Sequence, residues 1–298
     1  MPYSHHPSRP FIALMMCVCC CGHTAIAQQD KPADQDPVAA ADDAADDVAD
    51  DAPAPDPLTE QAIEALAPLL DQIVTAKSSR STVELSVDTV VDGAVISSQT
   101  SIYQIASTAP GSFTIYLKED ARRTRIYCDG KTATIALSTT AYTTLDAPIP
   151  MQRAVFELPV PMGAYPEPVL ALTLAGVDPK LTLTTGMKSV RLVDREKFRG
   201  ETPAVHFTAV QDDDVKWDLW MTQDKVPQPL RLLVDLSDML RANGGLDLPA
   251  GYRYLLRFDF KSWRINQEND PSLYQYKLVE GAEKFDSIAD FHNAQQQP

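Results

Sequence analysis

The chain has 298 residues, a net charge of −15 and 44% hydrophobic residues. So acidic a protein is a poor partner for nucleic acids and for anionic membrane surfaces, both of which attract lysine and arginine. Of its five cysteines, only Cys128 lies beyond residue 21, which excludes an intramolecular disulfide in the rest of the chain.

The first predicted element is an export signal over residues 1–27. Arg9 is followed by an apolar stretch over residues 11–21 and then by Ala25-Ile26-Ala27. This is the order of a basic region, an apolar region and a small-residue cleavage site. We therefore expect the working protein to begin at Gln28 and to be exported to the periplasm.

The cysteine run inside this segment leaves an alternative open. A lipid anchor would make Cys17 or Cys21 the first mature residue, but the residues before them, Met16 and Cys20, fit a lipidation signal poorly. Soluble export to the periplasm is the preferred interpretation, with lipid anchoring or secretion as alternatives.

Residues 28–57 form a segment of extreme composition. They contain ten Asp and one Lys, a net charge of −9, and Val is their only larger apolar residue. Such a segment buries too little surface to offset the entropy of ordering, so we predict a disordered acidic linker. Loose Ca²⁺ binding by its Asp pairs is the alternative, although their spacing matches no ordered calcium loop.

A helix is predicted over residues 58–76, with Thr59 as its N-cap and a kink at Pro68. Its apolar residues recur at intervals of three and four, which is the pattern of one helix face. They are Ile63, Leu66, Leu69, Leu70 and Ile73.

From Ser81 the pattern changes to the two-residue alternation of strands. Hairpin turns are predicted at Asp92-Gly93 and Asp129-Gly130, because Asp-Gly accepts the left-handed backbone of a tight turn. Six short strands are expected here, around 83–91, 96–106, 113–117, 123–128, 132–138 and 142–146.

Two short helices are expected over 151–158 and 166–175, where apolar residues cluster between prolines. Strands return over 188–196, 203–210, 215–222, 229–236 and 252–264, and a flexible tail is expected over 286–298.

These elements predict a mainly β (α+β) domain over residues 58–285. A single antiparallel sheet of about eleven strands must curl at this length, so we expect a half-barrel plugged by the N-terminal helix and the short mid-chain helices. Because the strands alternate, one face is expected to be apolar along its whole length. The side chains predicted to line a ligand cavity on that concave face are Leu85, Val87, Phe113, Ile115, Leu117, Trp217, Leu219, Met221, Leu232, Val234, Tyr254 and Phe258.

The order of elements resembles the fold of outer-membrane lipoprotein carriers and receptors of the bacterial envelope. Three segments carry a closer resemblance to a family of exported bacterial proteins with an uncharacterised domain that shares this fold. They are Arg125–Thr132, Tyr142–Pro148, and Val215–Trp220 with Pro229–Leu232 after it. The resemblance covers roughly residues 58–285 and implies no catalytic residues and no cofactor.

Candidate chemistry is sparse. His206 could serve as a base, Asp212-Asp213-Asp214 could attract Ca²⁺, and Cys128 could be activated by nearby arginines. For each of these, a structural role is the simpler interpretation, so no catalytic or metal site is predicted. The cluster Arg122-Arg123-Thr124-Arg125 could receive an anionic head group, although cross-strand pairs with acidic residues are the commoner use of such arginines.

Two functional hypotheses remain. The preferred one is a non-enzymatic envelope protein that binds a lipid or an acylated protein in its concave face. The alternative is a structural or interaction module with a filled core, whose sheet edge or acidic linker docks an envelope protein. Oligomeric state is not predicted.

Overall fold

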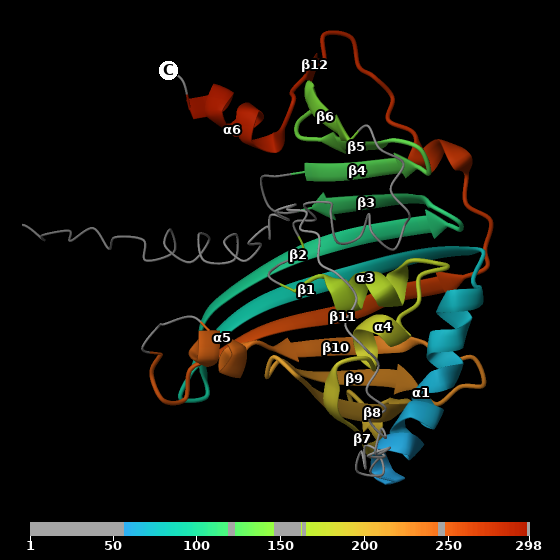
Figure 1. The fold of residues 1–298 in the computed structure, drawn as a ribbon, viewed down its shortest axis with the longest axis vertical. Coiled ribbons are helices and arrows are strands. Elements are labelled where there is room, and N and C mark those ends of the chain that lie inside the picture. The colour runs from blue at the N-terminus through green and yellow to red at the C-terminus, as the bar shows by residue number, and fades with distance from the viewer. Residues whose placement is uncertain (1–56, 119–122, 146–161, 163–164, 244–247, 297–298) are drawn as a thin grey trace, which may run out of the picture. The chain divides into compact units, whose positions relative to one another are not determined.

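The computed structural model describes residues 57–118, 123–145, 162, 165–243 and 248–296. The predictions for residues 1–56 and the helix expected over 151–158 lie outside these residues. The described residues belong to a unit that spans Pro55–Pro298. Its centre is one twelve-stranded sheet, in the order β12-β6-β5-β4-β3-β2-β1-β11-β10-β9-β8-β7 (Figure 1).

The elements in chain order are α1 (Pro57–Thr75), β1 (Ser78–Val91), β2 (Ala94–Thr108), β3 (Ser112–Lys118), β4 (Arg123–Asp129), β5 (Ala133–Ala136), β6 (Ala141–Leu145), α3 (Glu167–Thr173), α4 (Lys180–Leu183), β7 (Met187–Phe198), β8 (Thr202–Gln211), β9 (Lys216–Thr222), β10 (Pro229–Asp235), α5 (Ser237–Asn243), β11 (Arg253–Ile265), the 3₁₀ turn η2 (Pro271–Tyr274), β12 (Glu283–Lys284) and α6 (Ile288–Gln296).

The predicted fold class is confirmed: the domain is mainly β, with a single open sheet and few helices. The β1–β2 hairpin turns at Asp92 and Gly93, whose φ angles are 49° and 81°, as the Asp-Gly signal predicts. One detail differs. The sheet is mixed rather than wholly antiparallel, because the two-residue strand β12 pairs with β6 in parallel.

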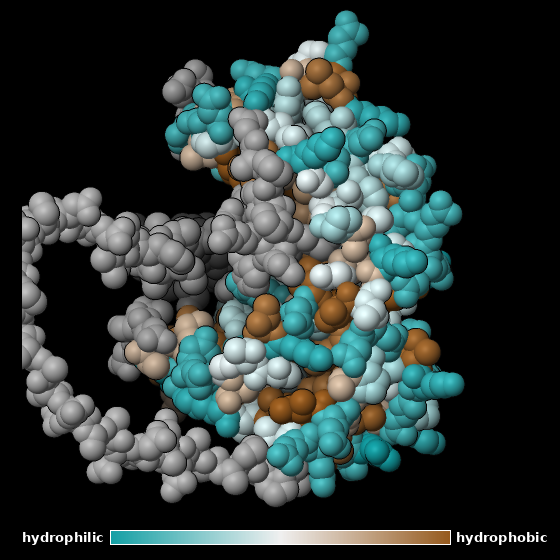
Figure 2. All heavy atoms as spheres, turned by 45° about the vertical axis from the view of Figure 1, so that its right-hand side comes forward, coloured by the Kyte–Doolittle hydropathy of each residue, from teal (hydrophilic) through white to brown (hydrophobic). Residues whose placement is uncertain are grey.

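The sheet curves around α1, α3 and α4, which lie on one side of it (Figure 1). Helix α1 turns its predicted stripe towards the sheet, so that Leu66, Leu69, Leu70 and Ile73 are buried. Ile63, by contrast, is 41% exposed. Figure 2 shows one face of the molecule, on which apolar residues of the described part lie among polar ones.

The C-terminal end differs from the flexible tail predicted over 286–298. Residues Ile288–Gln296 form helix α6, and its Phe291 is buried, edge-on to Phe285 with ring centroids 5.3 Å apart. Phe291 and the partly buried Ile288 therefore anchor this helix by apolar contacts. Within the described part of the chain, no helix combines the length and apolar character needed to cross a membrane.

Candidate functional site

The twelve residues predicted to line a cavity all lie on the side of the sheet that faces α1, α3 and α4. Cross-strand partners point to the same side of a sheet, so the register places them directly. One row runs from β1 to β7 through Leu85, Phe258, Leu232, Leu219, Phe207 and Leu192. The next row runs through Val87, Leu256, Val234, Trp217, Ala209 and Val190.

These side chains are deeply buried. Trp217, Leu219 and Phe258 are 0% exposed, and only Val87 and Tyr254 among the twelve are partly exposed. Together with the inner faces of α1 and α3 they form one apolar cluster. The structure thus brings the predicted residues together on one face, and their role in binding a ligand stays a prediction.

The apolar face is not continuous along its whole length, in contrast to the sequence-based expectation. On β2 the row of Leu85 continues to Ser101, and the row of Val87 continues to Gln99. The apolar side chains of β2 on this face begin at Tyr103, opposite Leu117 of β3. The face therefore stays apolar across β2 only from Tyr103 onward, where Tyr103 pairs with Val83 of β1 and Leu117 of β3, while the part of β2 that extends beyond β3 is polar on this side.

Hydrogen bonds fasten the end of α3 to the sheet. The hydroxyl of Ser79 on β1 donates to the carbonyl oxygen of Thr173. The indole of Trp263 on β11 donates to the carbonyl oxygen of Leu172 at 2.8 Å. Nearby, the backbone N–H of Gly176 donates to Ile73 at the end of α1 at 2.8 Å. The two covering helices are thus fixed at the same end of β1.

Polar groups at the start of α3 lie in an unusual environment. The hydroxyl of Tyr165 bonds to the side-chain amide oxygen of Gln211 on β8. Burial, reinforced by the charge of Asp213, raises the pKa of Tyr165 to about 12. Burial also raises the pKa of the Glu167 carboxyl. In both cases burial disfavours the charged form relative to an exposed side chain.

Two of the buried polar atoms on this side have no partner among the described residues: Nε1 of Trp217 and Oε2 of Glu167. Leaving a buried donor unpaired costs about 1–3 kcal/mol, so native structures usually supply a partner from protein, water or ligand. The sequence pattern already predicted that Trp217 lies on the apolar face. It did not indicate Glu167, because a single acid before a proline gives no signal of burial.

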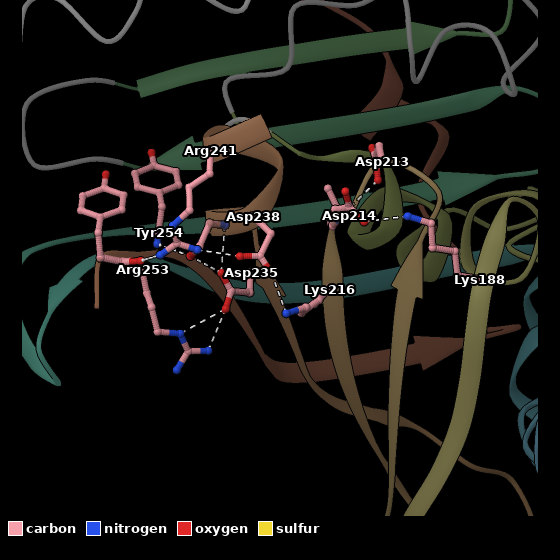
Figure 3. A network of polar contacts seen from close by, with 12 residues as sticks. Lys188, Asp213, Asp214, Lys216, Asp235, Asp238, Arg241, Arg253 and Tyr254 are labelled. Carbon is pink, nitrogen blue, oxygen red and sulfur yellow. Dashed lines mark hydrogen bonds and ion pairs between the residues drawn. The ribbon is translucent and has the colours of Figure 1, made fainter. Parts of the chain in front are cut away.

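Helix α5 is held at the end of β10 by ion pairs (Figure 3). Asp238 in its first turn lies 2.6 Å from Lys216 Nζ on β9 and 2.6 Å from Arg241 Nη1. The hydrogen bond from Lys216 lowers the pKa of Asp238 because it favours the carboxylate. Asp235 pairs with Arg253 of β11 at 2.8 Å. The network therefore joins three strands to α5.

His206 lies on the opposite, outer face of the sheet. Its Nε2 is 2.9 Å from Asp218 Oδ1, its Nδ1 is 3.8 Å from Glu196 Oε1, and its ring stacks on Trp220 with centroids 4.2 Å apart. Its polar partners among the described residues are therefore two carboxylates, with which it forms a cross-strand cluster on this face. This arrangement supports the structural interpretation of His206.

The other two candidates also have structural partners. Asp214 pairs with Lys188 at 2.6 Å, and the described residues contain no group of His, Cys, Asp or Glu side chains that could hold a metal. Cys128 is buried, and burial raises the pKa of its thiol. The lowering of this pKa that neighbouring arginines could cause is therefore not found.

Two cavities that sequence analysis missed lie on the outer face, beside the segment that carries η2. The larger has a volume of about 350 Å³ and the smaller about 310 Å³. Arg125, from the predicted basic cluster, lines the larger one. The segment that walls these cavities has no periodic pattern, so its position could not be inferred.

Comparisons with solved structures give distant similarities. A LolA superfamily protein from Nitrosomonas europaea is 12% identical with a TM-score of 0.31, over 74% of this chain and 98% of that one. A DUF1329 family protein from Desulfovibrio piger is 10% identical with a TM-score of 0.34, over 74% and 98%. An outer-membrane lipoprotein-sorting protein domain from Vibrio parahaemolyticus is 11% identical with a TM-score of 0.29, over 72% and 97%.

No curated protein matches the chain. A family profile, however, matches residues 62–286, which cover most of the described unit, and its description is "Predicted periplasmic protein". This match agrees with the exported, periplasmic location and with the family resemblance inferred from the sequence. The chain belongs to the DUF2092 family of periplasmic proteins.

Proposed function

We propose that this protein is a non-enzymatic carrier of the cell envelope that binds the acyl chain of a lipid or acylated protein between its sheet and the helices α1 and α3. The rows of Leu85 and Val87 provide an apolar floor of the kind that such a chain needs. Transfer of acyl methylenes from water contributes about 0.8 kcal/mol each, so partial insertion already gives useful affinity.

The observation that carries the proposal is the unpaired indole N–H of Trp217. Its side chain is 0% exposed and lies in the middle of the apolar floor. A core that is simply filled by side chains leaves this donor without an acceptor among the described residues. The ester or amide carbonyl of an acylated ligand supplies such an acceptor, which favours a ligand over a filled core.

Entry of the ligand requires α3 to move away from the sheet. Its C-terminal end is anchored through Ser79 and Trp263, whereas the hydroxyl of Tyr165, just before α3, bonds to Gln211 of β8. In the proposed opening, the anchored end acts as the pivot and the Tyr165–Gln211 bond breaks.

Quenching of tryptophan fluorescence by a dibrominated fatty acid tests this proposal. Trp217 lies on the apolar floor, while Trp220 lies on the outer face against His206. Two forms of the full chain are compared, and both keep Trp263 because its indole anchors α3. One form keeps Trp217 (Trp220→Phe) and the other keeps Trp220 (Trp217→Phe). Saturable quenching of Trp217, with Trp220 unaffected, is expected.

Equal quenching of both forms, or none, would contradict the proposal. Native mass spectrometry of the full chain purified from an envelope provides the second measurement. It is expected to show a mass increment that dissociates as lipid or acylated peptide.

A second candidate function is supported by the free edge of β2. Strand β3 pairs with β2 only from Ile102 onward, so Ala94–Thr100 has no partner strand on that side among the described residues. Val95 and Ile96 are 60% and 63% exposed, and Ala94–Thr100 contains no charge or proline. Natural sheets usually protect edges with charges or proline, so this edge suits an extended strand of an envelope protein.

Site-specific photocrosslinking separates this function from the first. A crosslinker at Val95 is expected to capture a specific envelope protein, and Ile96→Lys is expected to abolish the adduct. Val193 is the matched control, because it is 52% exposed on the other, charged edge strand β7. Equal adducts at both positions, or adducts only between two copies of the chain, would reject this candidate.

A further inference from the structure

The larger outer-face cavity has a wall of unusual charge. Alternate residues of β1 to β4 form its floor, and the segment after β11 forms its side. Three cations line it, Arg80 from β1, Arg125 from β4 and Lys277 from that segment, and no carboxylate does. This is unexpected in a chain with a net charge of −15, because acids outnumber bases and normally pair with them.

These cations differ from others on the same face of the sheet. Arg231 pairs with Asp259 at 2.7 Å, and Lys261 pairs with Glu84 at 2.9 Å. Arg80, Arg125 and Lys277 form no ion pair within the described part of the chain. Instead, Arg125 lies over the ring of Tyr116, 4.4 Å from its centroid, and donates to the Tyr127 hydroxyl at 3.2 Å.

Hydrogen bonds hold the segment that forms the side of the cavity in place. The side-chain amide of Asn269 donates to the carbonyl oxygens of Ser79 and Ser107, at 3.0 Å each, which fixes the segment at the end of β1 and β2. The Tyr274 hydroxyl bonds to Thr108 at 2.8 Å. Figure 1 shows this segment, in red, passing from β11 towards β12 along the ends of the strands. Two anchors thus hold it beside the cations.

Neutral hydrogen-bonding groups complete the lining. They include the amides of Gln104 and Gln275 and the hydroxyls of Thr82 and Tyr116. The adjoining smaller cavity shares Tyr127 and Gln275, and Tyr276 lines it with a buried hydroxyl that has no partner among the described residues. A cavity of about 350 Å³ is in the range that holds a small organic ligand.

We infer that this outer-face cavity binds an organic phosphate of glycerol-phosphate size, with Arg80, Arg125 and Lys277 around the phosphate. A phosphate ester offers several anionic oxygens to cations that arrive from different directions, and guanidinium groups match its geometry. The neutral groups receive the hydroxyls of the glycerol. At physiological salt, charges more than about 8 Å away are screened, so the nearby charges matter most. Three cations line this cavity, whereas the nearby acids are Asp129 in the adjoining cavity and Asp270, whose pKa Lys277 helps to lower.

This site is independent of the proposed acyl site, because the two lie on opposite faces of the sheet. The phosphate has two possible sources, a free organic phosphate or the head group of a phospholipid. Both present the same chemistry to the cavity, and the experiment below distinguishes them.

Isothermal titration calorimetry of the full chain with glycerol 3-phosphate tests whether the cavity binds a free organic phosphate. Flotation with phosphatidylglycerol vesicles, compared with phosphatidylcholine vesicles, tests whether it binds a phospholipid head group. The test variant is Arg80→Gln with Lys277→Gln, because both side chains are exposed and have no ion-pair partner among the described residues. The control is Lys188→Gln with Lys261→Gln, which removes the same charge from residues whose partners are Asp214 and Glu84.

We expect the test variant to weaken binding about tenfold or more and the control to stay within about twofold. Arg125→Lys keeps the charge but removes the planar guanidinium group, so it is expected to weaken binding only in part. Binding of glycerol 3-phosphate assigns a free ligand, and binding of phosphatidylglycerol vesicles alone assigns a head group. Binding of neither probe, or equal weakening by test and control variants, would overturn the inference.

Discussion

The hydroxyl oxygens of Ser79 and Ser107 lie 2.7 Å apart on the neighbouring strands β1 and β2, and both hold the chain around the end of α3. Ser79 donates its proton to the carbonyl oxygen of Thr173, so Ser107 must donate to Ser79. Ser107 in turn accepts from the backbone N–H of Ala175 at 2.8 Å. Two small side chains thereby connect two strands and the covering segment in one chain of bonds.

Ser107→Ala is therefore expected to lower the free energy of unfolding, although it removes only one oxygen atom. It removes two hydrogen bonds and leaves the Ala175 N–H without its acceptor, which costs about 1–3 kcal/mol of the free energy of unfolding. Urea unfolding followed by circular dichroism measures this, with Ser97→Ala on the exposed part of β2 as the control. Equal midpoints for the two variants would contradict the role given to Ser107.

Leu219→Ala probes the middle of the apolar floor. Leu219 is 0% exposed, between Leu232 and Phe207 in its row. Truncation of such a side chain costs about 2–5 kcal/mol, depending on how far the site collapses. Leu181 is 65% exposed, so Leu181→Ala is expected to change the free energy of unfolding by less than about 0.5 kcal/mol. A small effect of Leu219→Ala would show that this face is not close-packed.

Glu167→Gln is expected to change how the free energy of unfolding depends on pH. Burial raises the folded-state pKa of Glu167 above its ordinary value of 4.5, so the folded state binds a proton more tightly than the unfolded state. Wild-type stability therefore falls as the pH rises through the folded pKa, because the buried carboxylate must ionise. The side chain of Gln does not ionise, so the variant does not lose stability for this reason.

Thermal unfolding of the two forms across the pH range checks the prediction. We expect Glu167→Gln to be the more stable form above the folded pKa and to lose that advantage below pH 4.5. An advantage that is independent of pH would mean that ionisation of Glu167 is not its cause.

Cys128 is expected to react slowly with alkylating reagents in the folded protein. Its thiol is buried and its pKa is raised, mainly by desolvation, so little nucleophilic thiolate is present at neutral pH. Mass spectrometry of the peptide that contains Cys128 measures the rate of modification by iodoacetamide, in buffer and in urea. Similar rates in both conditions would exclude a buried thiol.

Much of the fold follows from local patterns in the sequence. Val83, Leu85 and Val87 alternate with polar residues because one side of β1 meets the helices, and Gly93 marks the turn because its φ is positive. The predicted helix over 166–175 appears as α3, in which residues from Pro168 to Thr173 are buried. Alternation also predicts that the cavity residues expected on one strand share a face, because that property depends only on the two-residue repeat.

Other features depend on contacts between distant segments, which local patterns do not encode. The strand β12 has two residues and exists only because Glu283 and Lys284 meet the edge of β6. The outer cavity exists only because Asn269 and Tyr274 bond to β1 and β2. Trp217 could be assigned to the apolar face from its position, but only the structure shows that its N–H has no acceptor among the residues it describes.

The central pairing of β1 with β11 has a consequence for biogenesis. Ser79 lies opposite Ile265, so the first strand of the domain has as its neighbour nearly the last. A ribosome releases the N-terminal part first, and contacts between ends so far apart form slowly. Until β11 emerges, one edge of the β1–β2 hairpin has no partner strand. The nascent polypeptide therefore cannot complete the centre of its sheet until synthesis is nearly finished.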